Sequence, residues 1–203
     1  ENIPNDDRVL SVPRFWKNER FYRSQAAARI AVVGNGETAA TIAECLGGSA
    51  AGIQVDVITP LAMNYSRGES YVENHVYTDP FQGNWFQMTP ENRREFISRT
   101  DRGVFSMTAK HAIDSMENIE IIPGRLTCVE IDKLGQLFVK VEYNDSSEKR
   151  HYDFVVLATG FDPLGFVKRI VSPEVGLSAL SVQEVESKIN ENLSLENLRP
   201  RLH

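Results

Sequence analysis

Two glycines and a threonine at the start of a predicted helix have the types and spacing of a phosphate-binding turn. Gly34, Gly36 and Thr38 follow an apolar run at residues 29–33, which is typical of a strand buried on both faces. Gly34 permits a tight turn, Gly36 lets the backbone approach a pyrophosphate, and Ala39 lets the helix pack closely on the strand. Because the first N–H groups of such a helix are free to bind phosphate, the pattern predicts a dinucleotide site.

The other residues of this turn have two interpretations. Asn35 and Glu37 lie in the turn, and Thr38 can reach a phosphate through its hydroxyl. Glu37 and Thr38 can equally cap the helix, where a carboxylate gains from the helix dipole. An ordinary glycine-rich turn is therefore the structural alternative. We treat all three residues as cofactor-binding candidates.

A second glycine motif lies far along the chain, where Thr159 and Gly160 follow the apolar run 153–157. Open α/β sheets bind ligands at the carboxyl ends of their parallel strands. Thr159 and Gly160 are therefore candidates for a dinucleotide or interdomain contact. The alternative is a tight turn that only leads the chain out of the sheet.

Hydrophobic periodicity predicts the elements that must position these motifs. Strand 29–33, a helix at about 37–46 and strand 53–58 form a βαβ unit, whose crossover we expect to be right-handed. The other predicted elements are helices at about 90–99, from about residue 103 and at about 182–190, and strands at 119–122, 126–131, 137–143 and 153–157, with a charged turn at 144–150. The predicted fold class is α/β, a Rossmann-like NAD(P)-binding domain with a central parallel sheet and a small β-meander.

Length, charge and cysteine content exclude several classes of protein. A chain of 203 residues is long enough for a proper core, and a net charge of −6 argues against nucleic acid or anionic membrane as the main partner. No apolar run reaches the roughly 18 residues of a membrane span, and the N-terminus does not resemble a signal peptide. Cys45, Cys128 and the histidines lack metal-ligand spacing, so we expect no metal site. Two buried thiols indicate a reducing compartment, and we expect a cytoplasmic protein.

We divide the chain into three segments. Residues 1–28 are polar and proline-marked and are interpreted as a connector, not an independent core. Residues 29–165 form the predicted nucleotide-binding domain, and residues 166–203 the start of a segment that ends abruptly. The stretch 59–90 is long and aromatic, and a loop of that size is usually functional or packs against something absent.

Five segments together indicate a family. The motifs at 34–39 (Gly-Asn-Gly-Glu-Thr-Ala) and 157–161 (Leu-Ala-Thr-Gly-Phe) flank the domain, and the segments 66–74, 99–106 and 160–164 lie within or beside it. They resemble the NADPH-binding domain of the flavin-dependent N-hydroxylating monooxygenases. They look most similar to the lysine N6-hydroxylases of mycobactin-type siderophore pathways, over nearly the whole chain.

The resemblance implies an activity and a missing part. In the whole enzyme NADPH reduces FAD, and the flavin then transfers one oxygen atom to the side-chain amine of L-lysine. Family members begin with a separate FAD-binding fold and finish with a segment that returns to it, and neither is visible in this sequence. We therefore expect a truncated part of a two-dinucleotide-binding flavoprotein, which binds NADPH, lacks most of its FAD site and is inactive alone. Homo-oligomer formation by the full-length protein is left open.

Four residues gain roles from the resemblance. Thr59 lies at the tip of the second strand, where the acid that would hold the ribose of NAD is absent because Asp56 lies inside the strand; this permits NADPH. Arg67 is the candidate for the 2′-phosphate, with a solvated loop cation as the alternative. Asn74 falls where the family holds substrate and nicotinamide, or else it forms a turn. Asp101 is a further cofactor-binding candidate; its acidic group could also suit a cationic lysine, or merely cap the helix that starts near residue 103.

Two other interpretations stay open. The chain could be the pyridine-nucleotide domain of another flavoprotein monooxygenase or reductase, although a disulfide reductase is disfavoured because no Cys-x-x-Cys is present. It could also be a binding or regulatory module that kept the nucleotide fold without its chemistry.

Overall fold

A parallel β-sheet forms the centre of the molecule. The computed structural model describes residues 3–61, 65–101 and 103–160, so the predicted helix at 182–190 and the segment 166–203 lie outside the described residues. The sheet order is β1-β8-β2-β3-β4, and all neighbours run parallel. Its strands are β1 (Val9–Ser11), β8 (Phe154–Leu157), β2 (Arg29–Val33), β3 (Gln54–Thr59) and β4 (Ile119–Pro123). The predicted α/β class with a central parallel sheet is confirmed.

The order in which the chain adds strands to this sheet reverses at β2. From β2 it passes through α3 (Glu37–Gly47) to β3 and then β4, which is the predicted βαβ unit and its extension. It later returns to the opposite side of β2 as β8. Such a reversal point is where open α/β sheets bind ligands, and both glycine motifs follow the strands that meet there.

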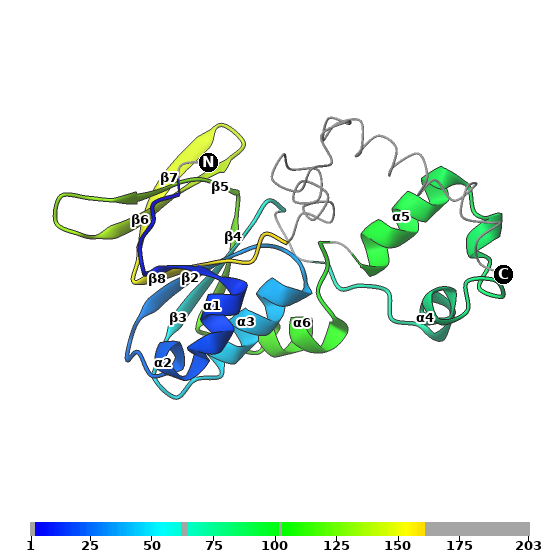
Figure 1. The fold of residues 1–203 in the computed structure, drawn as a ribbon, viewed down its shortest axis with the longest axis horizontal. Helices are drawn as coiled ribbons and strands as arrows, with labels where there is room; N and C mark the ends of the chain where they lie inside the picture. Colours follow the sequence, from blue (N-terminus) through cyan, green and yellow to red (C-terminus); the bar gives the residue numbers. More distant parts are fainter. Residues whose placement is uncertain (1–2, 62–64, 102, 161–203) are drawn as a thin grey trace, which may run out of the picture. The chain divides into compact units, whose positions relative to one another are not determined.

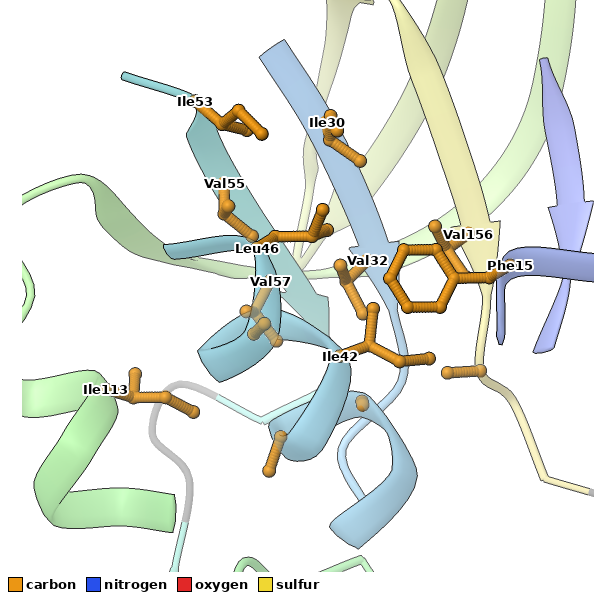
Figure 2. Packing of buried hydrophobic residues seen from close by; sticks show 14 of the residues in the cluster. Phe15, Ile30, Val32, Ile42, Leu46, Ile53, Val55, Val57, Ile113 and Val156 are labelled. Carbon is orange, nitrogen blue, oxygen red and sulfur yellow. The ribbon is translucent and has the colours of Figure 1, made fainter. Parts of the chain in front are cut away.

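Both faces of the sheet are buried, as the continuous apolar runs predict. On one face, Ile30 and Val32 pack with α1 (Val12–Lys17), α2 (Glu19–Arg23), α3 and α6 (Met107–Asp114). Figure 2 shows Leu46 and Ile42 of α3 directed at this face, with Phe15 beside Val156. On the other face, neighbouring strand residues pack against a second, antiparallel sheet. In the described ranges no helix is long and apolar enough to cross a bilayer.

The second sheet is the predicted meander, with one strand more than expected. It consists of β5 (Arg125–Ile131), β6 (Leu137–Tyr143) and β7 (Ser146–Tyr152) in that order. The expectation of a charged turn over 144–150 is therefore wrong from residue 146 onward. β7 is solvated over most of its length, so it lacks an apolar alternation, and its place is set by antiparallel backbone pairing with β6.

The first residues contribute to the core, which differs from their interpretation as a connector alone. β1 pairs with β8 at the edge of the parallel sheet. Leu10 and Phe15 are fully buried, and Tyr22 stacks on Phe15 with ring centroids 5.8 Å apart. Three strand residues are too few to show a period, and the aromatic anchors are spaced over two short helices. A link from these residues to a preceding domain stays a prediction.

The long segment after β3 contains helices that the sequence interpretation only partly predicted. These are α4 (Tyr71–Thr78), the short 3₁₀ helix η1 (Trp85–Gln87) and α5 (Pro90–Thr100). The Thr89 hydroxyl caps α5 as expected, accepting from the Asn92 N–H at 3.2 Å. α4 was missed, although Ser70 and Glu73 form a capping box at its start.

A buried carboxylate joins the two sheets. Asp56 of β3 is 3% exposed and accepts hydrogen bonds from the Tyr152 hydroxyl and from Arg29 Nη2, both at 2.7 Å. Arg150 Nη1 lies 3.4 Å from the same oxygen. Burial, and then the bond to Asp56, raises the pKa of Tyr152 well above its ordinary value.

We expect Tyr152→Phe to lower the free energy of unfolding by about 1–3 kcal/mol, because Asp56 loses a buried donor. Urea titration at neutral pH measures this. In the wild type, the unfolded chain ionises Tyr152 above about pH 10 while the folded chain keeps the proton, so this contribution is present below pH 10 and declines above it. Tyr71→Phe is the control, since Tyr71 is 80% exposed. Equal effects of the two substitutions would contradict the assignment.

Candidate functional site

A cleft of about 260 Å³ opens where β2 and β8 end. Gly34, Asn35 and Thr159 line it, so residues from both glycine motifs border one space. Its other lining residues are Ile3, Val33, Ile58, Pro60, Gly124, Arg125, Leu126 and Leu157. The cleft therefore lies at the carboxyl edge of the sheet, at the point where the strand order reverses.

The two glycines of the first motif lie in different surroundings, one crowded and one open. Gly34 has a φ of 151°, and a Cβ added there would overlap the carbonyl of Ala158, so packing inside the protein requires glycine. Gly36 has an ordinary φ of −106°, and an added Cβ would meet nothing within 4 Å. The folded protein itself does not require a glycine here. The open space at Gly36 is what a close ligand needs.

The start of α3 has the groups of an anion-binding site. Gly36 is its N-cap and offers no side chain to the first N–H groups of the helix. Thr38 is exposed in the first turn, so its hydroxyl is accessible from solvent. Backbone donors, the helix dipole and a hydroxyl thus occur together beside the cleft, which fits a phosphate.

Glu37 has a partner that sequence reasoning did not predict. Its Oε2 accepts a hydrogen bond from the backbone N–H of Ser106 at 2.6 Å. Ser106 in turn caps α6, its hydroxyl accepting from the Ala109 N–H at 3.2 Å. Asn35 makes a weaker contact to the same segment, 3.5 Å from the Gly103 carbonyl. The turn after β2 therefore holds the chain that leads into α6, and cofactor contacts by Asn35 and Glu37 stay predictions.

The segment that Glu37 holds is also hydrogen-bonded to Arg67. The Arg67 N–H donates to the Phe105 carbonyl at 2.7 Å, and Phe105 is next to Ser106. The Arg67 guanidinium contacts Glu69 at 2.7 Å. Glu69 first, and more weakly Glu37 and Asp101, raise the pKa of Arg67. The structure thus brings three predicted site residues, Glu37, Arg67 and Asp101, near one another, with Arg67 already paired.

Asn74 lies on a helix, and Asp101 lies in the turn that follows one. Asn74 is in α4, and its side-chain amide donates to the Glu69 carbonyl at 3.1 Å, which joins α4 to the Arg67 loop. Asp101 is the C-cap of α5, its N–H donating to Ile97 at 2.9 Å. Because Ser106 caps the following helix, the alternative role of Asp101 as its cap is wrong. Substrate binding by Asn74 and cofactor binding by Asp101 stay predictions.

The two strand tips differ in accessibility. Thr59 is fully buried, and its hydroxyl accepts from the Leu61 N–H at 3.4 Å, so it is not accessible to a ligand in this structure. Its carbonyl accepts from the Gly124 N–H at 2.7 Å. Thr159 is exposed at the cleft, and Gly160 has a φ of 90°, a backbone conformation that favours glycine.

Arg125 is a cleft residue that sequence reasoning missed. It is exposed at the first position of β5, directly after the β4–β5 turn. The Pro123-Gly124 pair marks that turn, but only the folded structure shows that the turn lies at the end of β3. Among the described residues, no group of histidines, cysteines and carboxylates is arranged to hold a metal ion.

The βαβ unit, the reversal at β2 and the glycine turn beside the cleft define a Rossmann-like dinucleotide-binding domain. Comparison of sequences gives the family: the chain belongs to the L-lysine 6-monooxygenase/L-ornithine 5-monooxygenase family, whose model matches residues 2–163. The resemblance inferred from the motifs is confirmed.

Curated relatives are named as L-lysine N6-monooxygenases. The chain is 32% identical to the L-lysine N6-monooxygenase MbtG of Mycolicibacterium paratuberculosis, over 98% of the chain and 48% of that protein. It is 31% identical to the protein of the same name from Mycobacterium tuberculosis H37Rv, with the same coverage. The chain therefore spans about half the length of the curated relatives it matches.

Solved structures agree on the fold. The lysine monooxygenase NbtG from Nocardia farcinica, described for its NADPH domain conformation, matches with a TM-score of 0.59 and 28% identity over 92% of this chain and 46% of that one. The ornithine N-hydroxylase KtzI of Kutzneria sp. 744 matches with a TM-score of 0.66 over 79% of this chain and 42% of that one. At 18% identity the second match supports the fold alone.

The two glycines give a matched pair of substitutions. We expect Gly34→Ala to lower the free energy of unfolding by at least about 2 kcal/mol, because of the overlap with Ala158 and the unfavourable φ. We expect Gly36→Ala to cost less than about 1 kcal/mol, yet to weaken binding of a dinucleotide roughly tenfold, or about 1.4 kcal/mol. Thermal unfolding and calorimetric titration with NADPH measure the two effects. A Gly36→Ala variant with unchanged affinity would count against this turn as the phosphate site.

Proposed function

We propose that this chain is the NADPH-binding portion of an FAD- and NADPH-dependent monooxygenase that N-hydroxylates the side-chain amine of L-lysine for siderophore biosynthesis. The observation that carries the proposal is the cleft at the strand reversal, bordered by the Gly34 turn and Thr159. The names of the curated relatives support lysine over ornithine.

The side chains at the cleft favour NADPH over NADH. A Rossmann-like domain that binds NAD holds the ribose hydroxyls with an acid near the end of the second strand. Here Asp56 has about the expected spacing, but it lies inside β3, where it is buried and bonded to Arg29 and Tyr152. With Asp56 engaged between the sheets, it is not free to bind a ribose hydroxyl.

In this proposal the chain binds and orients the reductant. The N–H groups at the start of α3 and the Thr38 hydroxyl bind the pyrophosphate, and Thr159 borders the same cleft. When bound, NADPH supplies the hydride that reduces FAD, which is held mainly by regions outside this chain. Asn74 contacts the substrate, whose amine must be uncharged to act as a nucleophile. The chain alone is therefore inactive.

Two competing proposals predict different results. A nucleotide domain of another flavoprotein would bind the same cofactor but would not respond to lysine in the longer protein. A module without chemistry would bind the cofactor and show no oxidation of NADPH at all. We also propose a cytoplasmic location, because Cys45 and Cys128 are not joined in a disulfide.

Calorimetry with the 203-residue chain tests cofactor binding, and we expect NADPH to bind more tightly than NADH. Tighter binding of NADH, or no binding at millimolar concentration, would contradict the proposal.

The longer protein, loaded with FAD, tests the substrate. We expect hydroxylamine formation that depends on lysine, with ornithine a poor substitute. Ornithine preference would overturn the substrate assignment and leave the cofactor assignment standing.

A further inference from the structure

We propose that Arg125 binds the 2′-phosphate of NADPH and thereby sets the preference for NADPH over NADH. The inference rests on the proposed function, because it requires the cleft to hold a pyridine dinucleotide. It replaces Arg67, the arginine that sequence reasoning favoured for this contact.

The position of Arg125 is the first argument. In Rossmann-like domains the adenosine ribose lies at the carboxyl end of the second strand, which here is β3. The Gly124 N–H donates to the Thr59 carbonyl at 2.7 Å, so the residue before Arg125 is attached to the last residue of β3. Arg125 also lines the cleft together with Pro60 and Asn35. The backbone of Arg125 therefore lies near the place where a ribose 2′-oxygen is expected.

The turn that presents Arg125 has little freedom. Gly124 has a φ of 144°, and an added Cβ would overlap the Val141 side chain on β6. Arg125 itself pairs with Glu142 in the β5–β6 register. Because its backbone is fixed on both sides, ligand binding needs to order only the side chain.

The charge around the two arginines is the second argument. The carboxylate opposite Arg125, Glu142, is paired with Lys140 at 2.7 Å, and no ion pair of Arg125 itself occurs within the described part of the chain. Arg67, in contrast, is paired with Glu69 and has Glu37 within electrostatic reach. A phosphate carries up to two negative charges, so carboxylates beside Arg67 would repel it.

The chemistry of the side chain fits the ligand. A guanidinium is always charged and can bind a phosphate through two parallel N–H···O bonds. An exposed arginine at the edge of a cleft can do this without leaving an existing partner. Arg125 is such a residue, and Arg67 would first have to release Glu69.

Binding of adenosine fragments to the 203-residue chain tests the inference. The probes are adenosine 2′,5′-bisphosphate and 5′-AMP, which differ only by the 2′-phosphate. We expect the wild type to prefer the bisphosphate and Arg125→Ala to bind it about ten- to a hundredfold more weakly, with 5′-AMP unchanged. Arg67→Ala, and Arg94→Ala on the exposed face of α5, are the matched charge controls and should keep the preference.

The outcomes separate the two proposals. If Arg125→Ala keeps the preference, or weakens both probes equally, the role of Arg125 is overturned while NADPH binding by the wild type still supports the proposed function. If the wild type binds neither NADPH nor the bisphosphate, both proposals fail. Thermal midpoints within about 2 °C of the wild type confirm that each variant is folded, since surface substitutions rarely exceed about 0.5 kcal/mol.

Discussion

The parallel pairing of β2 with β8 is the constraint on which the site depends. These strands lie far apart in sequence, yet Val33 pairs with Leu157 and the Ala158 N–H donates to the Val33 carbonyl at 2.8 Å. The pairing brings the exit of β8 so close to Gly34 that no side chain fits there. Both glycine motifs thus reach one edge of the sheet because of a single non-local contact.

A second non-local interaction determines where the meander lies. Asp56 accepts from Arg29 within the parallel sheet and from Tyr152 at the end of β7. A buried carboxylate is costly unless donors surround it, so the arrangement that satisfies Asp56 is strongly preferred over slipped alternatives. The arrangement also fixes the sheet whose first residue is Arg125.

The sequence predicted what local patterns encode. The strands β2, β3 and β8 are apolar runs bounded by glycine or polar residues, and α5 begins with a threonine cap followed by proline. β1 and β7 were not predicted, because three residues show no period and a solvated strand shows no apolar alternation. α4 had a readable signal in Ser70 and Glu73, which an aromatic, irregular context obscured. Partners such as Ser106 for Glu37 join distant elements, and no local pattern specifies them.

The charged residues near the site form two groups, one around Glu37, Arg67 and Glu69 and the other at Arg125. The first group is held together by the hydrogen bond from the Ser106 N–H to Glu37. Glu37 holds the Ser106 N–H, and the adjacent Phe105 holds Arg67, so the loop with Glu69 is drawn to the start of α3. The carboxylates that gather there leave Arg67 paired, whereas the N–H groups at the start of α3 have no capping side chain and can bind a phosphate. Arg125 lines the cleft and makes no ion pair among the described residues, because Glu142 opposite it is paired with Lys140. This arrangement supports a dinucleotide that extends from Arg125 across the glycine turn.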